Sequence, residues 1–275
     1  MKLSSVVFSP TGTSGRIARE IARALSTSFG NGIVDEIDVT CREYVSKSFG
    51  DDDLVVIAAP VYGGHMAPVA KERMKGLSAS GTPCVLVAVY GNRAFENALK
   101  DMAEFASSLG FVPVAAGAFV GEHSYSTPEA PIALGRPDDQ DMMDTHTFAL
   151  EIAEKIAACR LGPIDVSMLS DEPSPEQSLR NFREFVMEYQ RQQQEAPRKF
   201  LPEVDAELCN SCGECYEVCP MGAISADFHG VDVAKCIKCC ACVKTCPAGA
   251  RSLFTPFARP LSENFNGRKS PVWIV

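Results

Sequence analysis

The chain has 275 residues, of which 46% are hydrophobic and 22% charged, and it carries a formal net charge of −9. This length suits one large domain with a second, smaller one, and the composition is ordinary for a soluble globular protein. The negative charge argues against nucleic acid or an anionic membrane surface as the main partner. It suits a protein that docks on the basic patches of other proteins.

Cysteine is unevenly distributed along the sequence. Nine of the twelve cysteines fall between residues 209 and 246. The first ten residues are predicted to form a strand and not an export signal, and no apolar run is long enough to span a membrane. We therefore expect a cytoplasmic protein, and in a reducing compartment clustered cysteines bind metal more often than they form disulfides.

Five short apolar runs are predicted to be β-strands that alternate with segments of helical periodicity. The third and fourth runs are apolar on both faces, as in a parallel sheet that is covered on both sides. This alternation predicts a doubly wound α/β domain over residues 1–165. The strands are expected at residues 3–8, 33–39, 54–59, 84–89 and 112–120, and the helices at residues 14–29, 67–77, 94–109 and 141–159.

The composition changes after this first domain. Residues 166–199 are predicted to be a linker that contains a polar helix at residues 176–195. An aromatic stripe on this helix indicates a connector packed against one or both domains, with a solvated tether as the alternative. Residues 200–256 have short segments and dense cysteine and are predicted to be a small second domain, while residues 257–275 form a tail without a clear pattern.

The second domain contains an internal repeat with an offset of 27 residues, from Cys209 to Cys236. Each copy reads C-x2-C-x2-C-x3-C-P, the ligand run of bacterial [4Fe–4S] ferredoxins. Three thiolates at two-residue gaps let one tight loop wrap three corners of a cubane cluster, and the proline turns the fourth thiolate toward a neighbouring cluster. The first copy contains Cys209, Cys212, Cys215 and Cys219, and the second contains Cys236, Cys239, Cys242 and Cys246.

Zinc is the alternative to iron–sulfur clusters at these cysteines. Zinc sites usually use two C-x2-C pairs separated by a longer loop, and two four-cysteine runs that end in Cys-Pro fit this pattern poorly. The repeat therefore predicts two [4Fe–4S] clusters. Cys240 lies between two of the ligands and outside the spacing, so it is expected to pack as a small apolar thiol.

The first strand is followed by a hydroxyl-rich turn, Ser9-Pro-Thr-Gly-Thr-Ser14, that leads directly into a helix. Free amides and the helix dipole make such an N-terminus an anion site. The turn is neither a P-loop, because no Gly-Lys-Ser/Thr follows it, nor a G-x-G-x-x-G dinucleotide loop. Hydroxyl groups and amides without a lysine suit the monoester phosphate of FMN.

With this turn the sequence resembles the flavodoxins, whose phosphate loop has the form S/T-x-T-G-x-T/S. With the cysteine repeat, the whole chain resembles the flavodoxin–ferredoxin fusion proteins of anaerobic bacteria and archaea. The resemblance implies a five-stranded parallel sheet in the order 2-1-3-4-5 and a small α+β ferredoxin domain. It also implies crossed ligand sets, in which Cys209, Cys212, Cys215 and Cys246 bind one cluster and Cys236, Cys239, Cys242 and Cys219 bind the other.

The resemblance also assigns the flavin site. Gly63 and Gly64 would let the backbone approach the ring edge, with an ordinary tight turn as the alternative. Tyr62 or Phe95 could stack on the ring, and Phe95 could equally be a core residue. Arg93 could neutralise a reduced flavin or remain on the surface. The phosphate loop comprises Ser9, Thr11, Gly12, Thr13 and Ser14, and the two loops around the ring comprise Pro60, Val61, Tyr62, Gly63 and Gly64, and Tyr90, Gly91, Asn92, Arg93 and Phe95.

These cofactors predict an electron carrier that exchanges electrons between FMN, the two clusters and external redox proteins, with no catalytic acid, base or nucleophile. The alternative is a flavin-dependent reductase that uses NAD(P)H, a quinone or another small acceptor. A redox sensor is less favoured, because the acidic chain offers no region for binding DNA or a partner. No nucleic acid and no membrane span are expected, and the sequence leaves a homodimer open.

Overall fold

A computed structural model describes residues 1–275 apart from residues 31, 42 and 43. The chain divides into two compact units. The flavodoxin-like fold lies in the unit made of Met1–Glu122, Gly135–Glu172 and Lys269–Val275, and the cysteine repeat lies in the unit made of His123–Leu134 and Pro173–Arg268. We refer to them as the α/β unit and the cysteine-rich unit. None of the described helices is long and apolar enough to cross a membrane.

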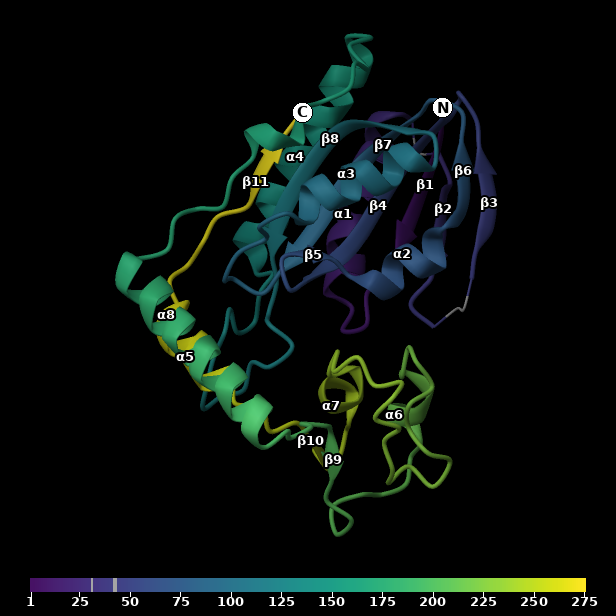
Figure 1. The fold of residues 1–275 in the computed structure, drawn as a ribbon. Helices are drawn as coiled ribbons and strands as arrows, with labels where there is room; N and C mark the ends of the chain where they lie inside the picture. Colours follow the sequence, from purple (N-terminus) through teal and green to yellow (C-terminus); the bar gives the residue numbers. More distant parts are fainter. Residues whose placement is uncertain (31, 42–43) are drawn as a thin grey trace. The chain divides into compact units, whose positions relative to one another are not determined.

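The α/β unit is built on a central sheet whose long strands are all parallel (Figure 1). These strands lie in the order β2-β1-β4-β7-β8. Numbered among themselves, they have the order 2-1-3-4-5, so the predicted flavodoxin-like topology is confirmed. The strand bounds are Lys2–Val7 for β1, Val34–Asp38 for β2, Asp53–Tyr62 for β4, Thr82–Tyr90 for β7 and Phe111–Val120 for β8.

Short strands extend this sheet beyond the five that the sequence predicts. The strand β11 (Val272–Ile274) adds to the edge of the sheet by pairing antiparallel with β8. β5 (His65–Met66) forms a hairpin with β4. β3 (Ser46–Phe49) and β6 (Gly76–Ala79) form a separate parallel pair, and β6 occupies the place where the predicted second helix was expected to end.

Helices cover both faces of the sheet (Figure 1). On one face, α1 (Thr13–Ser28) packs beside α4 (Asp139–Ala157), and their apolar residues form a continuous core with β1, β4 and β7. On the other face lie α2 (Pro68–Met74) and α3 (Ala98–Ser108). A short 3-10 helix, η1 (Val166–Met168), follows α4 and still belongs to this unit.

The cysteine-rich unit has short elements around the repeat. Its α5 (Glu176–Glu195) has the predicted helical bounds, and its aromatic stripe packs on α8 (Ala258–Asn264) and the residue before it. Phe185 and Tyr189 both contact the ring of Phe257 edge-on, at 5.2 and 4.8 Å between ring centroids. The remaining elements are β9 (Glu203–Val204), α6 (Glu214–Glu217), α7 (Ala241–Thr245) and β10 (Arg251–Ser252).

Candidate functional site

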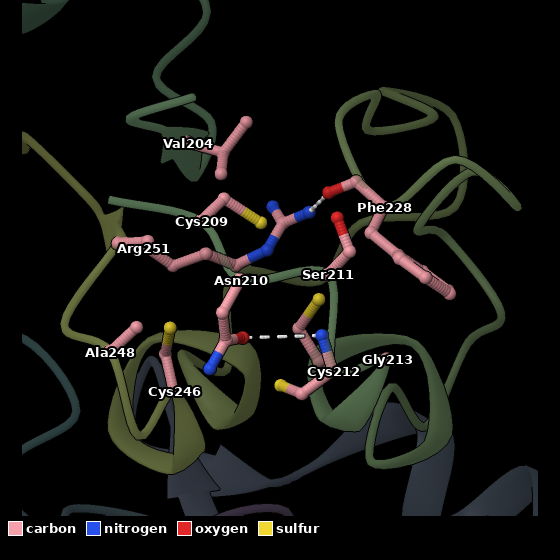
Figure 2. Close-up of a pocket in the computed structure, with 12 residues that line it drawn as sticks. Val204, Cys209, Asn210, Ser211, Cys212, Gly213, Phe228, Cys246, Ala248 and Arg251 are labelled. Atoms are coloured by element: carbon pink, nitrogen blue, oxygen red, sulfur yellow. Dashed lines mark hydrogen bonds between the residues drawn. The ribbon is translucent and has the colours of Figure 1, made fainter. Parts of the chain in front are cut away.

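The eight cysteines of the two predicted ligand runs line two separate cavities. Each cavity takes three cysteines from one copy of the repeat and the last cysteine from the other. The first cavity, of about 310 Å³ including its open mouth, is lined by Cys209, Cys212, Cys215 and Cys246 (Figure 2). The second, of about 320 Å³, is lined by Cys219, Cys236, Cys239 and Cys242. All twelve cysteines of the chain lie in described residues, and all are free of disulfides.

The two copies of the repeat fold in the same way. In each copy, two residues of the tight loop have left-handed backbone conformations at matching places: Ser211 and Gly213 in the first copy (φ 57° and 82°), and Lys238 and Cys240 in the second (φ 58° and 63°). The second residue of each pair is the N-cap of a short helix, α6 or α7, which carries the third cysteine. These conformations turn the loop tightly enough to place three thiols around one cavity.

The donor set of each cavity fits a cubane cluster. A [4Fe–4S] cluster takes four thiolates. Each cavity is lined by the four cysteines of one crossed set, and the second cavity is also lined by Cys240. Burial raises the pKa of Cys239 to about 11, as in other thiols with apolar surroundings. The sulfur atoms surround a space and do not meet at a point: within the described ranges, no three His, Cys, Asp or Glu side chains are grouped for a single metal ion.

One charged residue, Arg251, lines the first cavity together with the cysteines. It is 4% exposed, and its Nη2 donates a hydrogen bond to the carbonyl oxygen of Phe228 (Figure 2). Its Nη1 is buried without a hydrogen-bond partner among the described residues. Arg251 carries no sequence signal of its own, but at the repeat offset it occupies the place of the apolar Ile224 in the first copy, which marks it as unusual.

The extra cysteine, Cys240, is 2% exposed and lines the second cavity. Its Sγ donates to the carbonyl oxygen of Lys238 at 3.6 Å. Burial raises the pKa of this thiol, and the neighbouring Cys239 and Cys242 raise it further. Cys240 therefore packs as a neutral thiol in a backbone conformation that favours glycine.

A loop from the middle of the sequence completes the cysteine-rich unit. Residues 123–134 follow β8, yet they belong to this unit. The Nζ of Lys244, in α7, donates to the carbonyl oxygen of Ser126 at 2.9 Å. Burial raises the pKa of Tyr125 to about 12. The His123 ring packs on that of Tyr125 at 5.0 Å between centroids, so this histidine lies within the cysteine-rich unit.

The predicted phosphate loop lies at the N-terminus of α1, a helix of 16 residues. The hydroxyl of Ser9 accepts a hydrogen bond from the amide of Gly15 at 2.9 Å. Gly12 has φ 82°, and its carbonyl accepts the first helical hydrogen bond, from Arg16. The amides of Thr13 and Ser14 precede that bond and remain for an anion. No atom lies within 4 Å of where a Cβ on Gly12 would stand, so the loop leaves room for a phosphate.

The first predicted ring loop is a hairpin turn. Pro60, Val61 and Tyr62 end β4, and Gly63 and Gly64 join it to β5 with φ of 58° and 81°. Two left-handed residues in a row are typical of the tightest hairpin turns. The backbone of Gly63 and Gly64 therefore has the conformation of an ordinary tight turn, which was the alternative to a flavin contact. Tyr62 is half-buried beside these glycines.

The second predicted ring loop follows β7 and includes buried side chains. Phe95 is 1% exposed, and its ring contacts that of Tyr90 edge-on at 5.7 Å between centroids. In this structure Phe95 is thus a core residue. Asn92 is buried with φ 64°, next to the half-buried Gly91. Arg93 forms an ion pair with Glu96 at 2.6 Å.

Later segments of the α/β unit hold this second loop in place. Both carboxylate oxygens of Asp171 accept hydrogen bonds from backbone amides of the loop, at 2.7 Å from Phe95 and 2.9 Å from Glu96. Lys269, near the C-terminus, donates to the carbonyl oxygens of Arg93 and Glu172 at 2.7 and 2.9 Å. Neither residue could be predicted from the sequence, because no local pattern marks a contact between segments so far apart in the chain.

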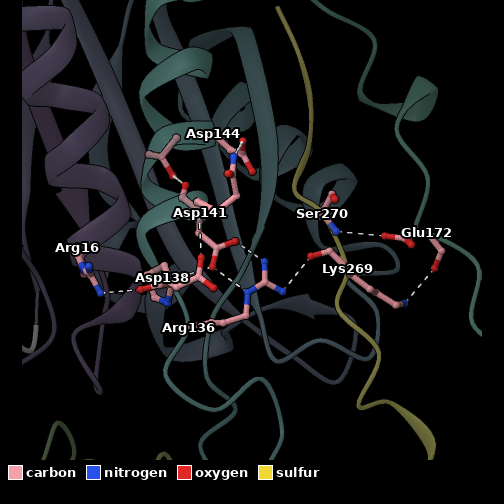
Figure 3. A network of polar contacts seen from close by, with 11 residues as sticks. Arg16, Arg136, Asp138, Asp141, Asp144, Glu172, Lys269 and Ser270 are labelled. Carbon is pink, nitrogen blue, oxygen red and sulfur yellow. Dashed lines mark hydrogen bonds and ion pairs between the residues drawn. The ribbon is translucent and has the colours of Figure 1, made fainter.

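The same C-terminal segment is tied to the start of α4 (Figure 3). The guanidinium of Arg136 donates to the carbonyl oxygen of Lys269 at 2.9 Å and to Asp141 through Nε at 2.8 Å. Asp141 also accepts from the amide of Asp138, and Asp138 caps the helix in return. This buried ion pair therefore supports the segment from which Lys269 reaches the loop after β7.

Comparison with protein families finds a flavodoxin domain at residues 6–127 and a 4Fe-4S binding domain at residues 201–224. The second match spans only the first copy of the cysteine repeat. Comparison with curated proteins finds no match.

Similar solved structures include a flavodoxin from the domain Archaea, 16% identical, which covers 57% of this chain and 99% of its own with a TM-score of 0.39. A flavodoxin from Streptococcus pneumoniae TIGR4 is 22% identical, with coverages of 56% and 99% and a TM-score of 0.38. The apo form of an NADH:FMN oxidoreductase, EMOB, is 13% identical, with coverages of 56% and 89% and a TM-score of 0.40.

Proposed function

Because the chain is organised as a flavodoxin–ferredoxin fusion, we propose that it is an electron-transfer protein that passes electrons between FMN, two [4Fe–4S] clusters and external redox proteins. A flavodoxin domain implies FMN, and a 4Fe-4S domain implies an iron–sulfur cluster. The observation that carries the proposal of two clusters is the sorting of eight cysteines into two cavities of four, each with three cysteines from one repeat copy and one from the other.

The α/β unit supplies the groups that would hold FMN. The amides of Thr13 and Ser14 at the start of α1, with the hydroxyls of the same loop, would bind the phosphate. The ring would lie between the hairpin at Gly63 and Gly64 and the loop after β7. The two glycines of the hairpin offer backbone without side chains, and the loop after β7 is fixed by the hydrogen bonds that its amides donate to Asp171.

The cofactors supply the electron chemistry of this proposal: a flavin exchanges one or two electrons, and a cubane cluster exchanges one. The residues of the chain bind and orient these groups and exclude water from them. Such a role needs no catalytic acid, base or nucleophile. We assign the protein to the cytoplasm, where thiols are kept reduced and clustered cysteines bind metal more often than they form disulfides.

The partners proposed for this carrier are redox proteins. The net charge of −9 favours proteins that present basic patches, and the attraction between opposite charges would speed their encounter. A dependence of the reaction rate on salt tests this, because salt screens the attraction between exposed charges. The rate should fall as salt rises, and a rate that is independent of salt contradicts steering by charge.

The cofactor content of anaerobically purified protein tests the proposal. We expect about eight iron atoms and about eight sulfide ions for each FMN. Protein without a flavin absorbance would overturn the FMN assignment, and about four iron atoms for each protein chain would show that it holds one cluster and not two.

Rapid anaerobic mixing with NADH or NADPH separates a carrier from a reductase. Fast bleaching at about 450 nm, where oxidised flavins absorb, with turnover of an added acceptor would show a reductase and contradict the carrier.

A further inference from the structure

The two copies of the cysteine repeat fold in the same way but carry an apolar and a charged side chain at one pair of equivalent buried positions. In the first copy, Ile224 forms a β-bridge with Val231. In the second copy, Arg251 pairs with Val204 in the same antiparallel manner. Each partner is displaced by the same repeat offset, so Ile224 and Arg251 are equivalent. One copy therefore places an apolar side chain, and the other a cation, beside the cysteines.

The side chain of Arg251 is buried and incompletely satisfied. It is 4% exposed and lines the first cavity with Cys209 (Figure 2). One end of its guanidinium donates to Phe228, and Nη1 is buried without a hydrogen-bond partner among the described residues. No carboxylate in the described part of the chain forms an ion pair with it. A buried cation with an unused donor costs free energy unless a negative group lies beside it.

A thiolate-ligated cubane cluster in the first cavity would be that negative group. We propose that Nη1 of Arg251 donates a hydrogen bond to a sulfur atom of this cluster, and that the charge of Arg251 makes it the easier of the two clusters to reduce. The inference rests on the proposed function, because it requires a cluster in each cavity. Arg251 is thus a positioning residue that tunes a potential.

The direction of the effect follows from charge. Reduction adds one electron, supplied by an external donor, to the cluster and leaves the proton on Arg251. The reduced cluster is the more negative one, so a nearby cation and a hydrogen bond to sulfur both stabilise it and raise its potential. The arginine therefore gives the two clusters a fixed order of reduction.

Among the described residues, no buried cation lines the second cavity. Ile224 stands at the matching place, and the cation that lines this cavity, Lys238, is exposed to solvent, which screens its charge. The second cluster should therefore respond to Arg251 in the same direction but less strongly, because Arg251 lines the first cavity alone.

The test uses full-length holoprotein, labelled with ¹⁵N-arginine and reduced with dithionite in the presence of redox mediators. Pulsed EPR should detect a ¹⁵N coupling on one cluster signal, which identifies the cluster beside Arg251. That signal should appear first in a potentiometric titration. In Arg251→Met, the coupling should vanish and the equilibrium constant for reducing this cluster should fall about tenfold, which is about 59 mV for a one-electron couple.

Two further variants serve as controls. Ile224→Met changes the matching position of the other copy, and it should keep the ¹⁵N coupling and the early reduction of the first cluster. Arg251→Lys keeps the charge, and it should retain more of the wild-type potential than Arg251→Met does. In Arg251→Met, the equilibrium constant for reducing the second cluster should fall by about threefold or less.

The outcomes separate this inference from the proposed function. Wild-type protein with about eight iron atoms but no ¹⁵N-arginine coupling overturns the role of Arg251 and leaves the carrier proposal intact. Reduction potentials of the two clusters that are unchanged in Arg251→Met also overturn the role of Arg251 and leave the carrier proposal intact. Wild-type protein that holds fewer than two clusters overturns the proposed function itself. If Arg251→Met fails to fold, the coupling in the wild-type protein still decides the question.

Discussion

Asp171 accepts a hydrogen bond of 2.7 Å from the backbone amide of Phe95, which lies 76 residues earlier in the chain. Its other oxygen accepts from the amide of Glu96, so one carboxylate binds two successive amides of the loop after β7. From the sequence, Asp171 falls in a predicted linker. In the structure it shapes one of the two loops proposed to enclose the flavin ring.

Removal of this carboxylate should therefore weaken flavin binding. Asp171→Ala leaves two loop amides without their acceptor, and the loss of charge-assisted hydrogen bonds of about 1.5–3 kcal/mol each should lower FMN affinity at least about tenfold. Titration of flavin-free protein with FMN, followed by fluorescence, measures the affinity. Asp165→Ala removes a nearby exposed carboxylate that caps only η1, and it should bind FMN as the wild type does. Equal affinities for the two variants would refute a role for Asp171.

The buried pair of Arg136 and Asp141 should stabilise the α/β unit strongly. The two side chains are 6% and 4% exposed. Arg136→Met leaves a buried carboxylate without its partner, which typically costs about 3–5 kcal/mol of unfolding free energy. The double variant Arg136→Met, Asp141→Leu removes both charges and should cost less than the single change. Fluorescence of Trp273, the single tryptophan of the chain, reports the unfolding of this unit by urea. Additive losses in the double variant would show that the two residues are not coupled.

The crossed sorting of the cysteines predicts which thiols are released when one ligand is removed. Cys219→Ala should destroy the cluster of the second cavity and reduce the iron content from about eight to about four. Anaerobic alkylation followed by mass spectrometry should then label Cys236, Cys239 and Cys242 but not the first set.

Cys246→Ala is the matched control for this experiment, because it changes the same position of the other repeat copy. It should expose Cys209, Cys212 and Cys215 to alkylation and protect the second set. If each variant instead releases the three cysteines of its own copy, the ligand sets are not crossed.

Cys240 should be dispensable for cluster binding. It occupies a left-handed conformation in which the other copy has glycine, Gly213. Cys240→Gly relieves a backbone cost of about 1–2 kcal/mol but removes a buried thiol, so stability should change by about 1 kcal/mol or less. Cys240→Val puts a β-branched residue in the same conformation and should destabilise the second cluster. Iron analysis during urea unfolding compares the variants, and loss of a cluster in Cys240→Gly would make this cysteine a ligand.

Some of these features could be predicted from the sequence because their signals are local. The doubly wound α/β class follows from apolar runs that alternate with helical periodicity, whereas the strand order is implied by the resemblance to flavodoxins. The polar helix α5 is flanked by prolines, and its predicted and observed bounds agree. The cysteine spacing sets which thiols share a loop, and the structure gathers the same two sets of four. Their binding of clusters stays a prediction.

Other features depend on long-range contacts and could not be predicted in this way. The strand β11 has three residues and exists only because β8 offers it a free edge. Arg136 and Asp141 lie in an acidic, proline-containing stretch that looks exposed, and only their mutual contact allows them to be buried. Lys269 lies in the predicted tail without a clear pattern, yet it reaches the loop after β7.

The division of the chain into two interrupted units limits which fragments of the protein can fold as complete units. A fragment that stops at residue 172 lacks β11 and exposes the edge of β8, which invites aggregation. A fragment that starts at residue 173 lacks residues 123–134, including Ser126, to which Lys244 donates. The α/β unit is complete only with Lys269–Val275, and the cysteine-rich unit is complete only with His123–Leu134. A single break in the chain therefore cannot release either unit whole.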